Sequence, residues 1–492
     1  MSNGDDSNDG TGSEEAADTV GANGGDAWQS VEINAAMQTL ISSIDNRRLV
    51  FFCGAGLSMG EPSSLPSANA LVQKLEQKYQ RLHGQSLTNV VGSDIEEIAA
   101  WALDNAPEFQ NFFLPTINSD GFFQPSNPGH ETVADFLIAQ IAEAALGTNV
   151  DYLIEHAGKK LGRGRFQAIV RRCHLAQSPD HAPYLKLHGC FDDEQQHTVW
   201  CAQQLGESPI QERIDTFRNW MRVNLPGKDL LIVGYWTDWP YLNETLHESV
   251  RDLNPRSVVL VDPGDPIDLK NKAGGLWEWV AQSHDVNFQH VQADGNEFMG
   301  RLRRKYSAWF FRELLHEVKH EGRVREYYGV DSSEDVKLPP LDDMAMQDIY
   351  DLRRDFQGVP TGKPVTDRDP SGAGYERVGA LHQLLMEGTA TMEGRLYNLN
   401  GDALRLVNSQ GREVHRVKDD FEQAGETPRG VTAHVCVGSR GSLPGRQNLV
   451  REPTDDDVVR AGQGQEWWTD DDLFDYLNGQ TNILDTPPDD ED

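Results

Sequence analysis

A histidine that can accept a proton and an asparagine that can hold a polar ligand are the residues of this sequence best suited to chemistry. His188 ends the segment Tyr184-Leu-Lys-Leu-His-Gly189, which is typical of a strand that stops at a turn. An imidazole with an ordinary pKa near 6.5 accepts a proton from a hydroxyl or a water at neutral pH. Asn149 and Asp151 stand two apart in Gly147-Thr-Asn-Val-Asp151. Side chains two apart in an extended segment point to the same side, so this pair can grip a polar ring or a ribose.

Each of these residues also has a purely structural interpretation. His188 alone fits a packed histidine at a strand end, and Asn149 alone fits an amide that caps a turn. Asp192 and Asp193, which follow His188, lack partners at metal-ligand spacing and are typical of a solvated turn. A functional interpretation therefore depends on further motifs in a fixed order.

A glycine-rich turn supplies the first of those motifs. Cys53-Gly-Ala-Gly-Leu-Ser58 follows an apolar run directly, and its glycines let the backbone approach a phosphate. Ser58 can cap the next helix or donate to a pyrophosphate. Further along, Gly234-Tyr-Trp-Thr-Asp238 follows a second apolar run, and Asp262 ends a third with a carboxylate suited to ribose hydroxyls.

The elements that must position these residues are strands and helices in alternation. Short continuous apolar runs indicate buried parallel strands, and segments of helical period lie between them. We expect strands at Arg48–Cys53, Asp229–Gly234 and Ser257–Asp262, and helices at Ser67–Leu82 and Glu131–Leu146. The predicted fold class is α/β, a doubly wound Rossmann-like parallel sheet with its ligand at the carboxyl ends of the strands.

Composition divides the chain into five parts. Residues 1–28 predict a disordered acidic tail, 29–330 the doubly wound domain, 331–374 a linker, 375–462 a small, mainly β module of α+β type, and 463–492 an acidic tail with a short helix. Within the module we expect a helix at Tyr375–Met386 and strands at Thr389–Leu399, Ala403–Asn408, Glu413–Val417 and Val431–Gly438. The basic helical segment 300–326 predicts a closing helix with arginines on its solvent face, with an anionic partner as the alternative.

Charge and apolar content exclude several classes of protein. A formal net charge of −34 disfavours broad nucleic-acid binding, because phosphate backbones repel such a surface. It suits either a halophilic source or a merely acidic bacterial protein. No apolar run approaches the roughly 18 residues of a membrane span, and the N-terminus lacks the pattern of a signal peptide. We therefore expect a cytoplasmic protein without membrane contact.

Taken in order, these motifs resemble the sirtuin-like family, specifically its divergent prokaryotic defence branch. That branch reads approximately G-A-G-x-S, L-P, T-x-N-x-D, K-(I/L)-H-G and G-Y-S, and the resemblance covers about residues 33–300. It implies that NAD is the substrate and that His188, Asn149 and Asp151 are catalytic. The residues that it assigns to NAD binding are Gly54, Ala55, Gly56, Ser58, Pro66, Thr148, Gly234, Thr237 and Asp262.

The resemblance implies an NAD glycohydrolase that cleaves the nicotinamide–ribose bond with water as acceptor. In it His188 takes the proton, Asn149 holds the attacking water or a ribose hydroxyl, and Asp151 contacts the nicotinamide carboxamide. Two departures matter. Protein deacylases of the family carry four zinc cysteines in two close pairs, whereas Cys190 and Cys201 stand apart, so we expect no zinc. Trp236 replaces the serine of G-Y-S, which leaves that contact to Thr237 or the backbone.

Uncontrolled NAD loss would kill the host cell, so the resemblance implies an effector of anti-phage defence that is held quiet until activated. The expected partners are further copies of the chain, in a homo-oligomer, and an activator or sensor subunit such as an ATPase or an Argonaute-like protein. The leading alternative is a non-catalytic NAD- or nucleotide-binding sensor that reports through the C-terminal module. Protein deacylation is the least favoured.

Overall fold

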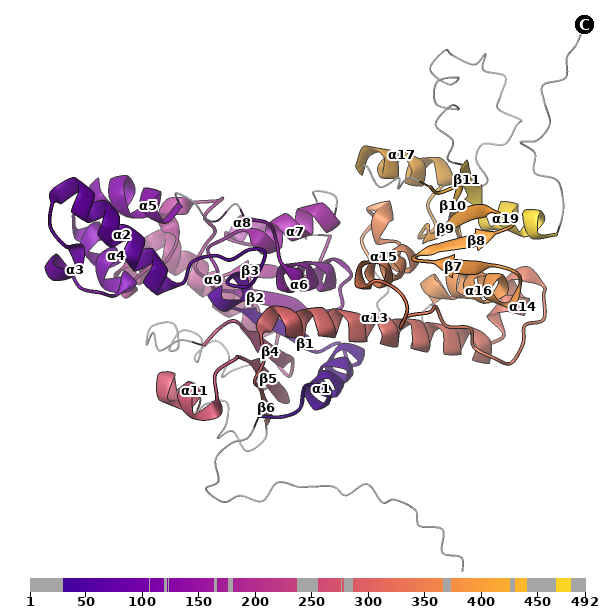
Figure 1. The fold of residues 1–492 in the computed structure, drawn as a ribbon, viewed down its shortest axis with the longest axis horizontal. Helices are drawn as coiled ribbons and strands as arrows, with labels where there is room; N and C mark the ends of the chain where they lie inside the picture. The colour runs from indigo at the N-terminus through magenta and orange to yellow at the C-terminus, as the bar shows by residue number, and fades with distance from the viewer. Residues whose placement is uncertain are drawn as a thin grey trace, which may run out of the picture.

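The computed structural model describes residues 30–105, 107–118, 122, 124–162, 166–175, 180–236, 255–275, 277, 286–365, 373–424, 430–439 and 466–478. The expected tail at 1–28 and Thr237 lie outside these residues. Two sheets, one near each end of the long helix α13 (Gly295–His320), form the described molecule (Figure 1). No helix in the described ranges is both long and apolar enough to span a bilayer.

The first sheet is the predicted doubly wound one. Its six strands are all parallel, in the order β3-β2-β1-β4-β5-β6. Side chains alternate between the faces of β1, so Phe51 packs into one hydrophobic core and Phe52 into the other. The strands are β1 (Leu49–Cys53), β2 (Ala144–Gly147), β3 (Tyr184–Lys186), β4 (Asp229–Val233), β5 (Ser257–Val261) and β6 (Asn287–Val291).

Helices cover both faces of this sheet. The core that holds Phe51 includes residues of α1 (Ile33–Asp45), α6 (Pro128–Ile138), α7 (Leu153–Leu161) and α13. The core that holds Phe52 includes residues of α9 (Ser208–Asn224) and α11 (Pro266–Lys272). Three 3-10 turns, η1 (Ala55–Ser58), η3 (Gln195–His197) and η4 (Ala202–Gly206), and the short α8 (Arg172–Leu175) lie in the connections.

The helix expected at Glu131–Leu146 is wrong at its carboxyl end. Helix α6 stops at Ile138, and the chain reverses at Gln140, whose φ is +53°. The apolar residues that follow form β2, in which Ala144 pairs with Val50 of β1. A short apolar run does not separate strand from helix by itself, and the pairing with β1 decides it here.

A small helical subdomain follows η1 and has its own hydrophobic core. It contains α2 (Ala68–His83), α3 (Leu87–Val90), α4 (Ile95–Asp104), a π-helical turn η2 (Phe109–Phe113) and α5 (Leu114–Asn118). Helix α2 confirms the expected helix at Ser67–Leu82, and Ser67 caps it by accepting from the Ala70 amide.

The second sheet is smaller and mixed, in the order β11-β10-β9-β8-β7. β7 to β9 pair antiparallel, and β9 to β11 pair parallel. Its strands are β7 (Thr391–Glu393), β8 (Leu396–Leu399), β9 (Asp402–Asn408), β10 (Ala433–Val437) and β11 (Glu466–Thr469). Its helices are α16 (Ala373–Glu387), α17 (Val414–Ala424) and α19 (Asp470–Leu477). The strand β11 thus lies within the segment 463–492 that was expected to be a tail.

The strand expected at Glu413–Val417 is wrong, because these residues open α17. Val414, Val417 and Phe421 follow the helical spacing of three and four, and all three are buried in one small core. The window Glu413–Val417 is too short to show that period.

The segment 331–374 contains a well-packed helix, although we expected a linker there. Helix α15 (Met346–Gln357) lies between α6 and α7 of the first part and the second sheet (Figure 1), with η5 (Val359–Thr361) after it. The short α14 (Arg323–Tyr328) follows α13. The expectation of solvent-facing arginines on α13 is wrong for Arg303, which is 1% exposed and bonded to Asp135 of α6.

Candidate functional site

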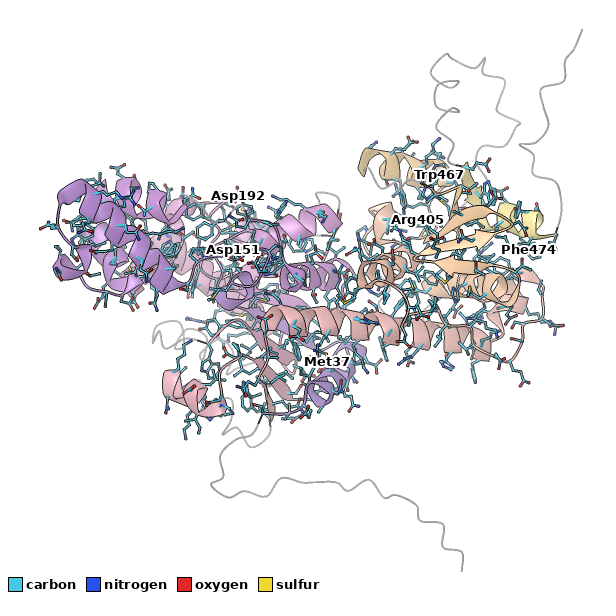
Figure 2. All side chains as sticks on the ribbon, viewed as in Figure 1. Met37, Asp151, Asp192, Arg405, Trp467 and Phe474 are labelled. Carbon is cyan, nitrogen blue, oxygen red and sulfur yellow. The ribbon has the colours of Figure 1, made fainter. Side chains whose placement is uncertain are left out.

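The predicted motifs meet at the carboxyl ends of neighbouring strands in the first sheet. Successive crossovers run outward in opposite directions from the adjacent pair β1 and β4, and such a switch point leaves a crevice outside the carboxyl ends. Figure 2 marks Asp151 in the part of the molecule that holds this sheet. The motif residues therefore lie where an open α/β sheet binds its ligand.

Ser58 is the centre of a buried hydrogen-bond cluster at the carboxyl ends of these strands. Its hydroxyl donates to Oδ2 of Asp151 at 2.9 Å and accepts from Nδ2 of Asn149 at 3.0 Å. It also lies 2.9 Å from Nε2 of His130. The Ser58 hydroxyl has one hydrogen, and it is donated in the bond to Asp151. Nε2 of His130 must therefore be the donor in the third bond.

The sequence analysis missed His130. It is the third residue of α6, where Asn127 and His130 form a capping box. Oδ1 of Asn127 accepts from the His130 amide at 3.1 Å, and the Asn127 amide donates to Nδ1 of His130 at 3.2 Å. Burial lowers the pKa of His130 to about 4, so the ring is neutral with its proton on Nε2. An Asn followed by Pro at the first helical position, in Asn127-Pro-Gly-His130, was the available signal.

Asn149 leaves one polar atom without a partner. The residue is 4% exposed, and its Nδ2 is committed to Ser58, but its Oδ1 has no hydrogen-bond partner. Asp151 differs, because its Oδ1 accepts at 3.1 Å from the amide of Leu153, the first residue of α7. A buried acceptor without a partner costs about 1–3 kcal/mol, and a ligand that donates to it recovers that cost.

His188 lies beside the same motif but is less basic than we expected. It is 8% exposed, and burial with the nearby positive charge of Arg213 lowers the pKa of His188 to about 3. A hydrogen bond with the Thr148 backbone opposes that shift and ties His188 to the segment of Asn149. The assumption of an ordinary pKa near 6.5 is therefore wrong, and the imidazole is neutral at physiological pH. Arg213 of α9 is a second residue that the sequence analysis missed.

Lys186 is a buried lysine that binds Asp151 and Glu155. It is completely buried, and Nζ bonds Oε1 of Glu155 at 2.6 Å and also the backbone carbonyl of Asp151. Burial by itself would lower the pKa of Lys186, but the Glu155 carboxylate outweighs it and raises the pKa. Sγ of Cys190 lies 3.4 Å from Nζ and from Oε1, so this thiol contacts both members of that ion pair.

The glycines of the first motif serve close packing of two strand ends. A Cβ on Gly54 would stand 2.5 Å from the Gly234 carbonyl oxygen, and one on Gly56 would stand 2.9 Å from the Gly234 Cα. Gly234 itself has a φ of +64°, in the left-handed region. Glycine is therefore required at these positions by the β1–β4 junction, whatever ligand binds there.

The remaining residues predicted to bind NAD have their own local contacts, apart from the Ser58 cluster. Thr148 is half-buried, and its amide donates to the Cys53 carbonyl at 3.1 Å. Ala55 is exposed in η1, and Pro66 is half-buried just before α2. Asp262 follows β5, at the far side of β4, and accepts from the Gly264 amide at 2.8 Å. Trp236 is buried, and its Nε1 donates to the Leu269 carbonyl, away from the Ser58 cluster.

The part of the chain that the structure describes holds no group of three or more His, Cys, Asp or Glu side chains that would bind a metal ion. The five cysteines are free thiols, of which only Cys173 is exposed.

A protein-family model and solved structures are similar to parts of this chain. Residues 143–286 match the SIR2-like domain family. This chain contains a SIR2-like domain. The match spans three of the predicted motifs, those at Thr148–Asp151, Lys186–Gly189 and Gly234–Thr237, and the sirtuin-like resemblance is confirmed. Gly54–Ser58 lies outside the matched range.

Solved Sir2 structures are similar to part of this chain. One, from work on the mechanism and regulation of Sir2 enzymes, is 15% identical, with a TM-score of 0.33, and the alignment covers 56% of this chain and 98% of that one. Another, a serine-to-alanine variant of a Sir2 homologue in complex with ADP-ribose, is 14% identical, with a TM-score of 0.33, covering 55% and 96%. No curated protein matches this chain.

Proposed function

We propose that this chain is an NAD glycohydrolase, which cleaves the bond between nicotinamide and ribose with water as the acceptor. The SIR2-like domain supports NAD-dependent chemistry in general. The observation that carries the finer proposal is the free Oδ1 of Asn149, held in the crevice by Ser58 and close to the segment of a neutral His188. That acceptor fits a water or a ribose hydroxyl.

The residues act on the charge that develops as the bond breaks. The electron pair of the C1′–N bond leaves with nicotinamide, and the ribose acquires oxocarbenium character. A water whose hydrogen is held by Oδ1 of Asn149 then adds to C1′, and its proton passes to His188. The products are nicotinamide, ADP-ribose and one proton.

A pKa of about 3 does not disqualify His188 as the proton acceptor. A water that bonds to a cationic carbon becomes an oxonium, which is far more acidic than an imidazolium of that pKa. The low pKa instead keeps His188 unprotonated before the reaction, in the form that can accept. Asp151 is proposed to contact the nicotinamide carboxamide with the lone pairs that Ser58 and Leu153 leave free.

The direct test is release of nicotinamide from NAD by the purified chain. With extract of infected cells added as the activator, wild type should release it, whereas His188→Ala and Asn149→Ala should not. Asn224→Ala, which removes an exposed amide on α9, serves as control. Binding of NAD by wild type without any release, even in infected-cell extract, would favour the non-catalytic sensor.

We also propose that the activity serves anti-phage defence, because unrestrained loss of NAD would harm the cell that makes the protein. The proposed assembly is a homo-oligomer under the control of an activator such as an ATPase or an Argonaute-like protein. Cells that carry wild type should lose NAD only after infection, whereas cells that carry His188→Ala should not. Unchanged NAD in infected wild-type cells would contradict this role.

A further inference from the structure

Three consecutive charged residues of α15 are buried, and each binds a different element. Arg353 and Asp355 are 0% exposed, and Arg354 is 6% exposed. Charged side chains are rarely buried unless they are paired. Their partners lie on α6, α7 and β9, so α15 joins the SIR2-like domain to the second sheet (Figure 1).

Arg353 holds α6. One of its terminal nitrogens bonds Oδ2 of Asp135, and its Nε donates to Oγ of Ser307 on α13 at 2.9 Å. Arg303 of α13 bonds the same Asp135 oxygen at 2.6 Å. Because Asp135 lies five positions after His130 on α6, this pairing fixes the helix that presents His130 to Ser58.

Arg354 holds α7. Its Nη2 donates to the carbonyl of Leu161, the last residue of α7, at 2.8 Å. The first residue of that helix, Leu153, donates its amide to Asp151, and Glu155 of the first turn binds Lys186. Neighbouring arginines of α15 therefore bind the two helices whose first turns form one wall of the candidate site.

Asp355 anchors α15 on the opposite side. It accepts from Nε and Nη2 of Arg405 at 2.8 and 2.6 Å, and Arg405 lies on β9. Figure 2 marks Arg405 in the part with the second sheet and Asp151 in the part with the first. We call the set Asp135, Arg303, Arg353, Arg354, Asp355 and Arg405 the α15 charge cluster.

We propose that Arg353 and Arg354 are positioning residues for the candidate site. They touch none of its members, and they fix α6 and α7 so that His130 and Asp151 meet at Ser58. A guanidinium supplies several bonds in a rigid plane, whereas an ammonium is a single point of charge, so lysine keeps the charge and loses the alignment. The effect on turnover rests on the proposed function, and the effect on the helices does not.

The experiment compares Arg353→Lys and Arg354→Lys with a matched control, Arg48→Lys. Arg48 pairs with Asp229 at 2.8 Å at the amino ends of β1 and β4, the opposite edge of the sheet. The first readout is amide hydrogen exchange of the ligand-free proteins at residues 127–133 and 151–157. The second is the kcat and the KM for nicotinamide release.

We expect Arg353→Lys to speed exchange about tenfold in 127–133 and Arg354→Lys to do so in 151–157, with the control within about twofold in both segments. In both variants we expect kcat to fall about tenfold while KM changes less than about twofold. The misaligned residues would stabilise the transition state less, whereas binding of NAD would change little. Arg354→Lys keeps the proposal testable if Arg353→Lys does not fold.

Unchanged exchange in both segments, or a rise of equal size throughout the chain, would overturn the positioning role. If wild type releases no nicotinamide under any condition, the proposed function fails, and the exchange result still decides the role of the arginines.

Discussion

The Ser58 cluster and the α15 charge cluster are both buried and polar, but they are built in opposite ways. Around Ser58 a hydroxyl, an amide and a neutral imidazole meet one carboxylate, and Oδ1 of Asn149 is left without a partner. In the α15 charge cluster, Asp135 and Asp355 each face arginines at hydrogen-bond distance. Buried charge persists only with a close opposite charge, so the α15 charge cluster depends on its ion pairs, whereas the Ser58 cluster holds one carboxylate among neutral groups.

The largest effect should come from the site itself. His188→Ala and Asn149→Ala should each lower nicotinamide release about 100- to 10,000-fold, the range expected for loss of a positioned acid–base group. Binding of NAD should persist, because these groups act where charge develops. Enzyme turnover and calorimetric titration with NAD measure the two quantities. The double variant should be little worse than either single one, and full additivity would indicate separate roles.

Breaking the α15 charge cluster should instead act on stability. Asp135→Asn takes the carboxylate from Arg353 and leaves Arg303 with Glu131 alone, and removal of one partner from a buried pair typically costs about 3–5 kcal/mol. We expect a lower midpoint of urea unfolding. Asp229→Asn, whose partner Arg48 is partly exposed, is the control and should lower the midpoint less. Equal losses in both variants would remove the distinction between a rigid cluster and an ordinary ion pair.

The close packing at the β1–β4 junction gives a smaller effect. Gly54→Ala puts a Cβ 2.5 Å from a backbone oxygen, so the two strand ends must separate. Overpacking of this kind typically costs about 1–3 kcal/mol. The melting temperature should fall, while Gly84→Ala, where no atom lies within 4 Å, tests the cost of a positive φ alone. If Gly54→Ala is as stable as wild type, the strand ends at the β1–β4 junction can separate without loss of stability.

The smallest effect is the dependence of folding stability on pH, which comes from the buried histidines at the candidate site. In the unfolded chain a histidine titrates near pH 6.5, whereas burial lowers the pKa of His130 to about 4 and of His188 to about 3. Between those values the unfolded state binds the proton, so stability is full above pH 6.5 and falls as the pH falls. Each histidine should contribute about 1 kcal/mol of loss between pH 6 and 5.

Thermal unfolding of wild type and His188→Gln at pH 6 and 5 measures this effect. The glutamine variant should show the smaller decrease. Asp135 should contribute nothing over this range, because its arginine partners keep the pKa of its carboxyl below the ordinary value despite burial. An identical pH dependence in the two proteins would contradict the buried, neutral state of His188.

Several features could be predicted because they depend on residues close together in the chain. The uninterrupted apolar runs before Gly54 and Gly234 predicted buried parallel strands, and both are present. Local patterns failed where a partner decided the outcome. Residues 144–147 became a strand because β1 lies beside them, and Val414 opens a helix because its period continues to Phe421.

The order of the motifs along the chain and the residue types at the carboxyl ends of the strands could be predicted, since neighbours along the chain carry that information. Only the tertiary structure buried His130 beside Ser58 and His188 near Arg213, and burial is the main cause that lowers the pKa of both imidazoles. It also turned an expected linker into α15, whose arginines find their partners about two hundred positions away along the chain. Desolvation and ion pairing depend on what surrounds a group in space, and that is the physical reason why spacing along the sequence did not reveal them.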